Sequence, residues 1–77
     1  MLTTVSPVAR YGRRIAAARD YAGLSRAQLA YRLDMSENTI GRYERDEYEP
    51  RLPVRQAIAR ACGVPDWFLE SGFQPRP

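Results

Sequence analysis

One short segment of the sequence carries polar side chains at the spacing of a single helix face. Glu37, Asn38, Gly41, Arg42 and Arg45 follow one another at intervals that a helix would turn to one side. Asn can form a bidentate pair with adenine, Arg can do so with guanine, and Glu can accept from the cytosine amino group. Such a face could bind base edges in a DNA major groove, although an ordinary solvated polar face is the alternative.

The polar segment contains a glycine, which destabilises a helix but could be useful for binding DNA. Gly41 would let a helix approach a groove closely, and it lowers helix stability by about 1 kcal/mol relative to Ala. We therefore expect the base-contacting set to be Glu37, Asn38, Gly41 and Arg42.

Two short helices are expected to position this face. Ser36 is a good N-cap for a helix from Glu37 to about Arg45, with Ile40 and Tyr43 facing inward. Ser25 and Gln28 form a capping box that opens a helix over residues 26–33. Asp34 lies between the two helices, where we expect a left-handed conformation. Two helices joined by such a short turn form the unit that places its second helix in the major groove.

The remaining segments read as further helices. We expect one from about Pro7 to Ala22, before Gly23, and a loop over residues 46–52. A fourth helix should end at Gly63, and a single-turn helix should start at Pro65. The inward residues expected are Tyr11, Ile15, Ala18 and Ala22 in the first helix and Val54, Ile58, Ala59 and Cys62 in the fourth. The fold class expected is all-α, a compact five-helix domain over residues 1–72, with 73–77 as a flexible tail.

Composition narrows the function. All twelve basic residues are Arg against nine acids, which favours a polyanionic partner but equally fits a GC-rich genome. The chain has no His, and its single Cys62 should be a small core residue rather than a reactive thiol. We therefore expect no metal, no cofactor and no small-molecule ligand. Without a Gly-rich phosphate loop or paired carboxylates after a strand, we do not expect an enzyme.

The sequence contains no run of about 20 apolar residues, the length that a membrane-spanning helix needs. We therefore expect no membrane span, and we expect a cytoplasmic setting.

Taken together, these pieces resemble the lambda-type helix-turn-helix family, that of phage Cro and repressor proteins and their bacterial relatives. The resemblance covers roughly Ile15 to Gly72, with the helix-turn-helix motif at about residues 26–45. It rests on a distributed set: Arg19, Gly23-Leu24-Ser25, Gln28-Leu29-Ala30, Ser36-Glu37-Asn38-Thr39-Ile40, Tyr43-Glu44, Pro50, Gly63-Val64 and Trp67. The sequence departs from the family at Asp34 in place of the turn glycine, in the acidic segment 46–49, and at Arg55, a usually apolar position.

The resemblance implies a Cro/repressor-like transcriptional repressor that binds an inverted-repeat operator in double-stranded DNA, in the nucleoid or a phage-infected host cell. It implies phosphate contacts by Arg26, Ser36, Thr39, Arg45 and Arg51. Arg26 and Arg51 could equally be ordinary surface residues. Arg10, Arg13 and Arg14 are expected on a solvated face, and Tyr31 and Arg32 on the surface. Arg19 and Glu44 look like the ion pair that relatives bury between the first and third helices.

A homodimer on DNA is expected to form through Trp67, Phe68 and Leu69, with help from Val64 and Phe73. Three consecutive large apolar residues cannot all face one small core. We expect Trp67 in the core and Phe68 or Leu69 at the interface. The alternative function is an antitoxin-like or adaptor module that uses the same fold to bind a protein.

Overall fold

A computed structural model describes residues 11–70, which form five helices and no strand. The helices are α1 (Tyr11–Ala22), α2 (Arg26–Leu33), α3 (Glu37–Glu44), α4 (Leu52–Cys62) and α5 (Trp67–Glu70). The expected all-α fold with five helices is therefore confirmed. The expected helix start at Pro7, the position of Arg10, the tail over 73–77 and the role of Phe73 lie outside the described residues.

Local capping explains why α2 and α3 begin and end where they do. The Ser25 hydroxyl accepts from the Gln28 backbone N–H at 3.0 Å, and the Gln28 side chain accepts from the Ser25 N–H at 2.8 Å. The Ser36 hydroxyl accepts from the Thr39 N–H at 3.1 Å. Asp34 adopts φ 58° and ψ 45°, the left-handed conformation expected of it. Both predicted caps and the turn are confirmed.

Three predicted boundaries need small corrections. The fourth helix begins at Leu52, inside the predicted loop, because Pro53 fits the first turn, where its missing N–H is not needed. The third helix ends at Glu44, and Arg45 is its C-cap. The last helix begins at Trp67 rather than Pro65, and the Pro65 carbonyl accepts from the Phe68 N–H in a turn that leads into the helix.

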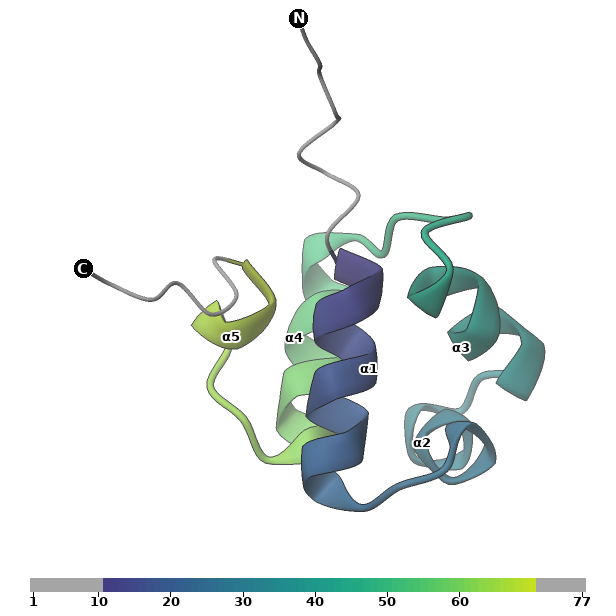
Figure 1. Cartoon of the computed structure of the whole chain (residues 1–77), viewed down its shortest axis with the longest axis horizontal. Helices are drawn as coiled ribbons and strands as arrows, with labels where there is room; N and C mark the ends of the chain where they lie inside the picture. Colours follow the sequence, from purple (N-terminus) through teal and green to yellow (C-terminus); the bar gives the residue numbers. More distant parts are fainter. Residues whose placement is uncertain (1–10, 71–77) are drawn as a thin grey trace, which may run out of the picture.

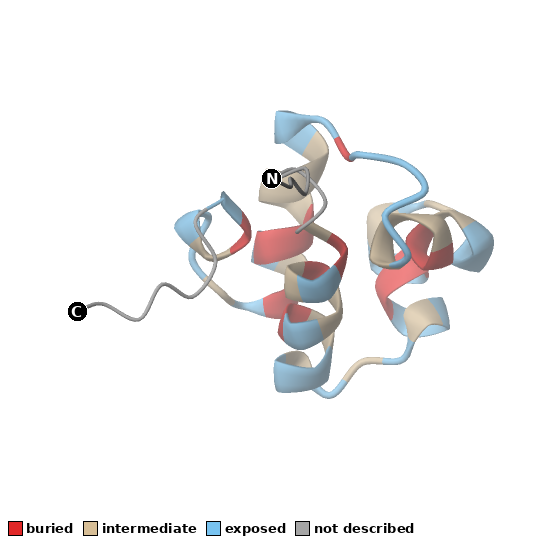
Figure 2. Cartoon of the chain, turned by 45° about the horizontal axis from the view of Figure 1, so that its top comes forward, coloured by how far each residue is buried: buried red, intermediate tan, exposed pale blue. Residues whose placement is uncertain are grey.

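The five helices share one core built around α1. Figure 1 shows α1 in the middle beside α4, with α2 and α3 on one side and α5 on the other. Accordingly, α1 contacts α3, α4 and α5, and α2 contacts α3 and α4. Buried positions lie on helix faces turned toward one another (Figure 2). The core consists of Ile15, Ala18, Leu29, Ala30, Ile40, Ile58, Ala59, Cys62 and Leu69, so every helix contributes to it. The predicted core position of Cys62 is confirmed.

A glycine sets the distance between α1 and the end of α3. A Cβ atom at Gly12 would overlap the Glu44 carbonyl oxygen and lie 2.8 Å from Oδ1 of Asp46. The Gly12 N–H donates to this same Oδ1 at 2.9 Å. Asp46 itself has a φ of 62°. The C-terminal end of α3 is therefore held against α1 at a separation that a larger residue would not allow.

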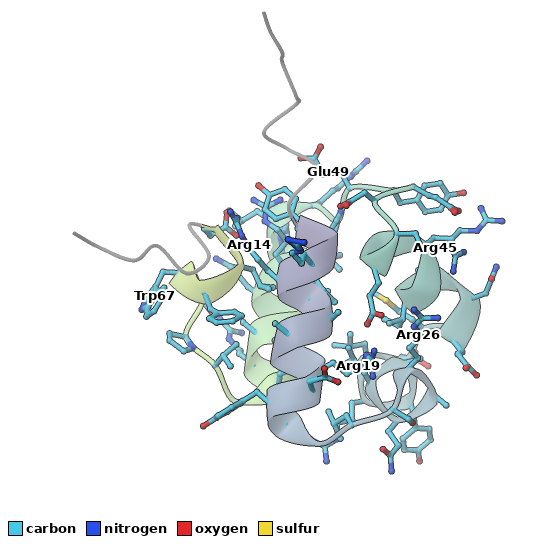
Figure 3. The ribbon with its side chains drawn as sticks, viewed as in Figure 1. Arg14, Arg19, Arg26, Arg45, Glu49 and Trp67 are labelled. Carbon is cyan, nitrogen blue, oxygen red and sulfur yellow. The ribbon has the colours of Figure 1, made fainter. Side chains whose placement is uncertain are left out.

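The burial of α5 is the reverse of the prediction. Leu69 has no exposed surface, whereas Trp67 is 59% exposed and lies on the outer side of α5 (Figure 3). Phe68 is partly buried against the core. A helix of only four residues can turn one large side chain fully inward, and Leu69 takes that position. The expectation of Trp67 in the core was wrong, and of the two expected interface candidates, Phe68 and Leu69, the second is fully buried.

Two arginines fix α5 to the rest of the domain. Arg14 donates to the carbonyl oxygens of Leu69 at 2.9 Å and Glu70 at 2.7 Å, so its assignment to a solvated face was wrong. Arg55 pairs with both carboxylate oxygens of Glu70 at 2.7 and 3.1 Å. Its guanidinium also stacks over the ring of Tyr11, 4.5 Å from the centroid. The Glu70 hydrogen bonds raise the pKa of Arg55 despite its burial, which explains an arginine at a usually apolar position.

Residues 11–70 contain neither a membrane-spanning helix nor a metal-binding cluster. None of the helices there is long and apolar enough to cross a membrane. The same residues contain no cluster of three or more side chains that could hold a metal ion.

Candidate nucleic-acid interface

The predicted polar face of α3 lies beside a hollow on the surface. We call Glu37, Asn38, Gly41, Arg42 and Arg45 the α3 outer face. All of these except Arg42 join Arg26 of α2 in lining a hollow of about 410 Å³. Glu37, Asn38 and Arg45 are exposed, and Figure 3 shows Arg26 and Arg45 on this side of the molecule. The structure therefore brings most of the predicted base and phosphate contacts to one place.

Gly41 is covered rather than open. It is buried, and a Cβ built there would lie 3.0 Å from Nη1 of Arg45 and 3.7 Å from Nη1 of Arg26. Close approach of α3 to a DNA groove at Gly41 stays a prediction, and in this conformation two arginine side chains lie over the glycine. The two guanidinium groups cover it, so Gly41 provides room for them.

Arg42 makes a contact that its position in the sequence does not indicate. Its Nη1 donates to the hydroxyl of Tyr48 at 2.7 Å. Its guanidinium carbon also lies 5.2 Å from the centroid of the Tyr48 ring, within the range of a cation–π contact. Tyr48 belongs to the segment between α3 and α4 and is 50% exposed. A loop residue therefore holds one of the predicted base-contacting side chains.

The arginines predicted at phosphate positions differ in their surroundings. Arg45 donates through Nε to Glu47 at 2.8 Å, with both side chains about half exposed. This hydrogen bond lowers the pKa of Glu47 below its ordinary value. Arg51 is exposed at the N-cap of α4 and does not cap it with its side chain. At the start of α3, the hydroxyls of Ser36 and Thr39 lie 2.9 Å apart in a mutual hydrogen bond.

A buried carboxylate supports the end of α3. Glu44 has a 4% exposed side chain and accepts from Nε of Arg19 at 2.6 Å and Nη2 at 3.2 Å. The ion pair predicted between α1 and α3 is present. Arg26 also donates from Nε to Glu44 at 2.9 Å, although its side chain is 41% exposed. Glu44 therefore has a second arginine partner in addition to the predicted one.

The pKa of Glu44 reflects two opposing causes. Burial of the carboxyl raises its pKa, but the hydrogen bonds from Arg19 and Arg26 more than offset this, and the pKa lies below its ordinary value. The hydrogen bond to Glu44 raises the pKa of Arg19 in turn. Glu44 is therefore ionised at neutral pH and connects three helices, because its two partners come from α1 and α2.

The class of this domain follows from its match to a known family. The model of the family described as a helix-turn-helix domain matches residues 10–67. The chain belongs to the helix-turn-helix family. Its helix-turn-helix unit is α2 and α3 with the turn at Asp34 between them, and α3 is the second helix of that unit.

The helix-turn-helix chain is also similar to a phage protein. It is 38% identical over 53 residues to the immunity repressor protein of Bacillus phage phi105. The match covers 69% of this chain and 37% of the phage protein, so this chain spans well under half of that relative's length.

Sequence reasoning missed the contributions of Gly12, Tyr48 and Asp46 to this helix-turn-helix site. The segment 46–49 differs from the family in its acidity, and that composition does not indicate a specific contact of Tyr48 or Asp46. A tyrosine six residues after Arg42 was the available signal, but the spacing alone does not show where a loop returns. Gly12, near the start of a helix, was a second signal of close helix packing.

Proposed function

We propose that this helix-turn-helix domain binds double-stranded DNA sequence-specifically and represses transcription, with α3 in the major groove. It acts as a binding protein, not through catalysis. The observation that carries the proposal is the hollow beside α3, which the exposed Glu37 and Asn38 line together with Arg26 and Arg45. These are side chains that pair with base edges and phosphates. The family membership and the similarity to an immunity repressor support the proposal.

Within the site, we assign two kinds of contact. Glu37, Asn38 and Arg42 contact base edges, and Arg26, Ser36, Thr39, Arg45 and Arg51 hold phosphates. Gly41 contributes by letting the two neighbouring guanidinium groups lie close to α3. Arg26 has a double role, because its Nε is already bonded to Glu44. Its position is therefore fixed before DNA arrives, which reduces the ordering cost of a phosphate contact.

The functional species we propose is a symmetric dimer on DNA. One recognition helix contacts too few base pairs for selectivity among genomic sites. Trp67 and Phe68 form the candidate interface, next to a surface depression lined by Arg13, Arg14, Ala17 and Phe68. Trp67 lies across the molecule from Arg45 (Figure 3), so a twofold axis near α5 leaves both α3 helices uncovered. The two helices should lie about 34 Å apart, on half-sites about 10 base pairs from centre to centre.

Selection of binding sites from random duplex DNA tests the proposal. The parent should enrich an inverted repeat. Asn38→Ala should weaken binding to that site by about 1–3 kcal/mol and relax one position of the consensus. Arg51→Ala should weaken all sequences similarly and lower the salt slope by about one. Arg60→Ala is the matched control, because Arg60 is an exposed arginine on α4 outside the site.

Several outcomes would contradict parts of the proposal. If the selection enriches no sequence, the protein does not recognise DNA specifically. That result would favour the alternative, a protein-binding module that uses the exposed Trp67 surface. An enriched site without inverted symmetry, or a saturated complex with one protein copy, would remove the dimer. If Trp67→Ala bound two half-sites as cooperatively as the parent, the dimer would form elsewhere.

A further inference from the structure

Tyr48 lies outside α3, yet it contacts the α3 outer face directly. Its hydroxyl accepts from Nη1 of Arg42 at 2.7 Å, and its ring lies beside the same guanidinium. An arginine side chain loses rotamer entropy when it is held in one geometry. Tyr48 therefore restricts Arg42 before any ligand is present.

The segment that carries Tyr48 is itself fixed at both ends. On one side, Asp46 accepts from the Gly12 N–H at 2.9 Å, and the Glu47 N–H donates to the Arg42 carbonyl at 2.9 Å. On the other side, Pro50 is fully buried, and its carbonyl accepts from Arg55 at 2.7 Å. Tyr48 is thus presented to Arg42 from a backbone tied to α1, α3 and α4, which is what a positioning residue requires.

The geometry also leaves Arg42 able to contact a base. Its Nη1 is bonded to Tyr48, so Nε and Nη2 remain as the two parallel donors of the guanidinium fork. Two parallel donors match the O6 and N7 acceptors of guanine in the major groove. The Tyr48 hydroxyl, as an acceptor to Arg42, keeps its own hydrogen for a phosphate oxygen or water.

We propose that Tyr48 is a positioning residue that sets the base preference of Arg42 for guanine. The inference rests on the proposed function, because it assumes that α3 binds in the major groove. It extends the specificity determinants beyond the recognition helix, into the segment between α3 and α4.

The test measures base discrimination rather than affinity alone. Random-duplex selection is carried out with the parent, Arg42→Ala, Tyr48→Phe and the double variant, followed by titration of the selected site and of the same site with its guanine replaced. Arg42→Ala should lose the guanine preference at one position of each half-site. Tyr48→Phe keeps the ring and removes the hydroxyl, so the preference should fall about fivefold at that position only. In the Arg42→Ala background, Tyr48→Phe should change nothing further at that position.

Two features keep the outcome clear. The ratio of affinities for two duplexes does not depend on the folded fraction of a variant, so modest destabilisation cannot imitate the result. Tyr21→Phe is the matched control, because Tyr21 is an exposed tyrosine on α1, and it should behave as the parent.

Failure of the inference differs from failure of the proposed function. If Arg42→Ala loses the preference while Tyr48→Phe discriminates as the parent does, the positioning role is wrong and α3 recognition stands. A uniform loss of affinity in Tyr48→Phe, with discrimination intact, likewise overturns positioning. If the parent selects no sequence, or Arg42→Ala keeps the full preference, base contact by Arg42 fails and the inference falls with it.

Discussion

Arg19 donates two hydrogen bonds to the carboxylate of Glu44, from Nε at 2.6 Å and from Nη2 at 3.2 Å, and so joins α1 to the last residue of α3. Arg26 adds a third hydrogen bond from α2. The carboxylate of Glu44 is almost fully buried, Arg19 is largely buried and Arg26 is considerably exposed. The three side chains should therefore contribute unequally to stability.

The first prediction is a ranking of these three side chains by the free energy of unfolding. Glu44→Ala should cost about 3–5 kcal/mol, because the charge of the largely buried Arg19 loses its carboxylate and keeps only the Leu24 carbonyl as acceptor. Arg19→Ala should cost about 2–3 kcal/mol, because Arg26 still hydrogen-bonds the carboxylate. Arg26→Ala should cost about 1 kcal/mol or less, since its side chain is considerably exposed. Urea titration measures all three, and equal costs for Arg19→Ala and Glu44→Ala would show that Arg26 gives no support.

The second prediction concerns acid. The pKa of Glu44 in the folded protein lies below its ordinary value of 4.5. Its stabilising effect should therefore be complete above pH 4.5 and be lost as the pH falls through the lowered pKa of the folded state. The difference in unfolding free energy between the parent and Glu44→Gln should shrink below pH 4.5. A difference that stays constant from neutral pH down to pH 3 would show that the folded protein does not depress this pKa.

The third prediction compares two glycines within helices. Gly41→Ala should stabilise the protein by about 0.5–1 kcal/mol, because Ala favours the helix and the nearest atoms are the mobile ends of Arg45 and Arg26. Gly12→Ala should destabilise it by about 1–3 kcal/mol, because the new methyl group overlaps backbone at Glu44. Thermal melts of both variants measure the contrast.

DNA binding provides a second measurement for the Gly41→Ala variant. Gly41→Ala should weaken operator binding although it raises the melting temperature, because the methyl group pushes the end of the Arg45 side chain away from α3. Unchanged or tighter binding by Gly41→Ala would show that the close packing of these arginines is unimportant for DNA. Opposite stability signs for the two glycines cannot come from helix propensity alone, which favours Ala at both.

The sequence predicted the helices and the polar face because these depend on local signals. Caps such as Ser25 and Ser36, the left-handed turn at Asp34 and the period of apolar residues act within a few residues of one another. The ion pair of Arg19 with Glu44 was predictable only through the family resemblance, since its members lie 25 residues apart.

The contacts that sequence reasoning missed are all set by tertiary structure. Nothing local shows that Tyr48 returns to Arg42, that Arg14 reaches the carbonyls of α5, or that Leu69 rather than Trp67 turns inward. Each of these three contacts depends on how the helices are placed relative to one another. Hydrophobicity alone favoured burial of Trp67, but the short α5 has room in the core for only one large side chain, which is Leu69.

The last prediction concerns the acidic segment after α3. Glu47 pairs with Arg45 at 2.8 Å on the exposed surface, and so competes with any phosphate for this arginine. Glu47→Gln should therefore raise DNA affinity about three- to fivefold at low salt, on all sequences alike, because an exposed ion pair is weak and its loss frees one cation. The salt slope should steepen by up to about one, since one more charge becomes available to neutralise phosphate.

A matched variant separates specific pairing from net charge. Glu49 is an exposed acid in the same segment (Figure 3), so Glu49→Gln makes the same change in charge without removing the partner of Arg45. Its gain in affinity should be smaller than that of Glu47→Gln. In an Arg45→Ala background the two substitutions should become equivalent, because no arginine remains for Glu47 to hold. Equal gains in the parent background would mean that the segment acts by general repulsion, and a loss of affinity in Glu47→Gln would mean that Glu47 orients Arg45 for DNA instead of competing for it.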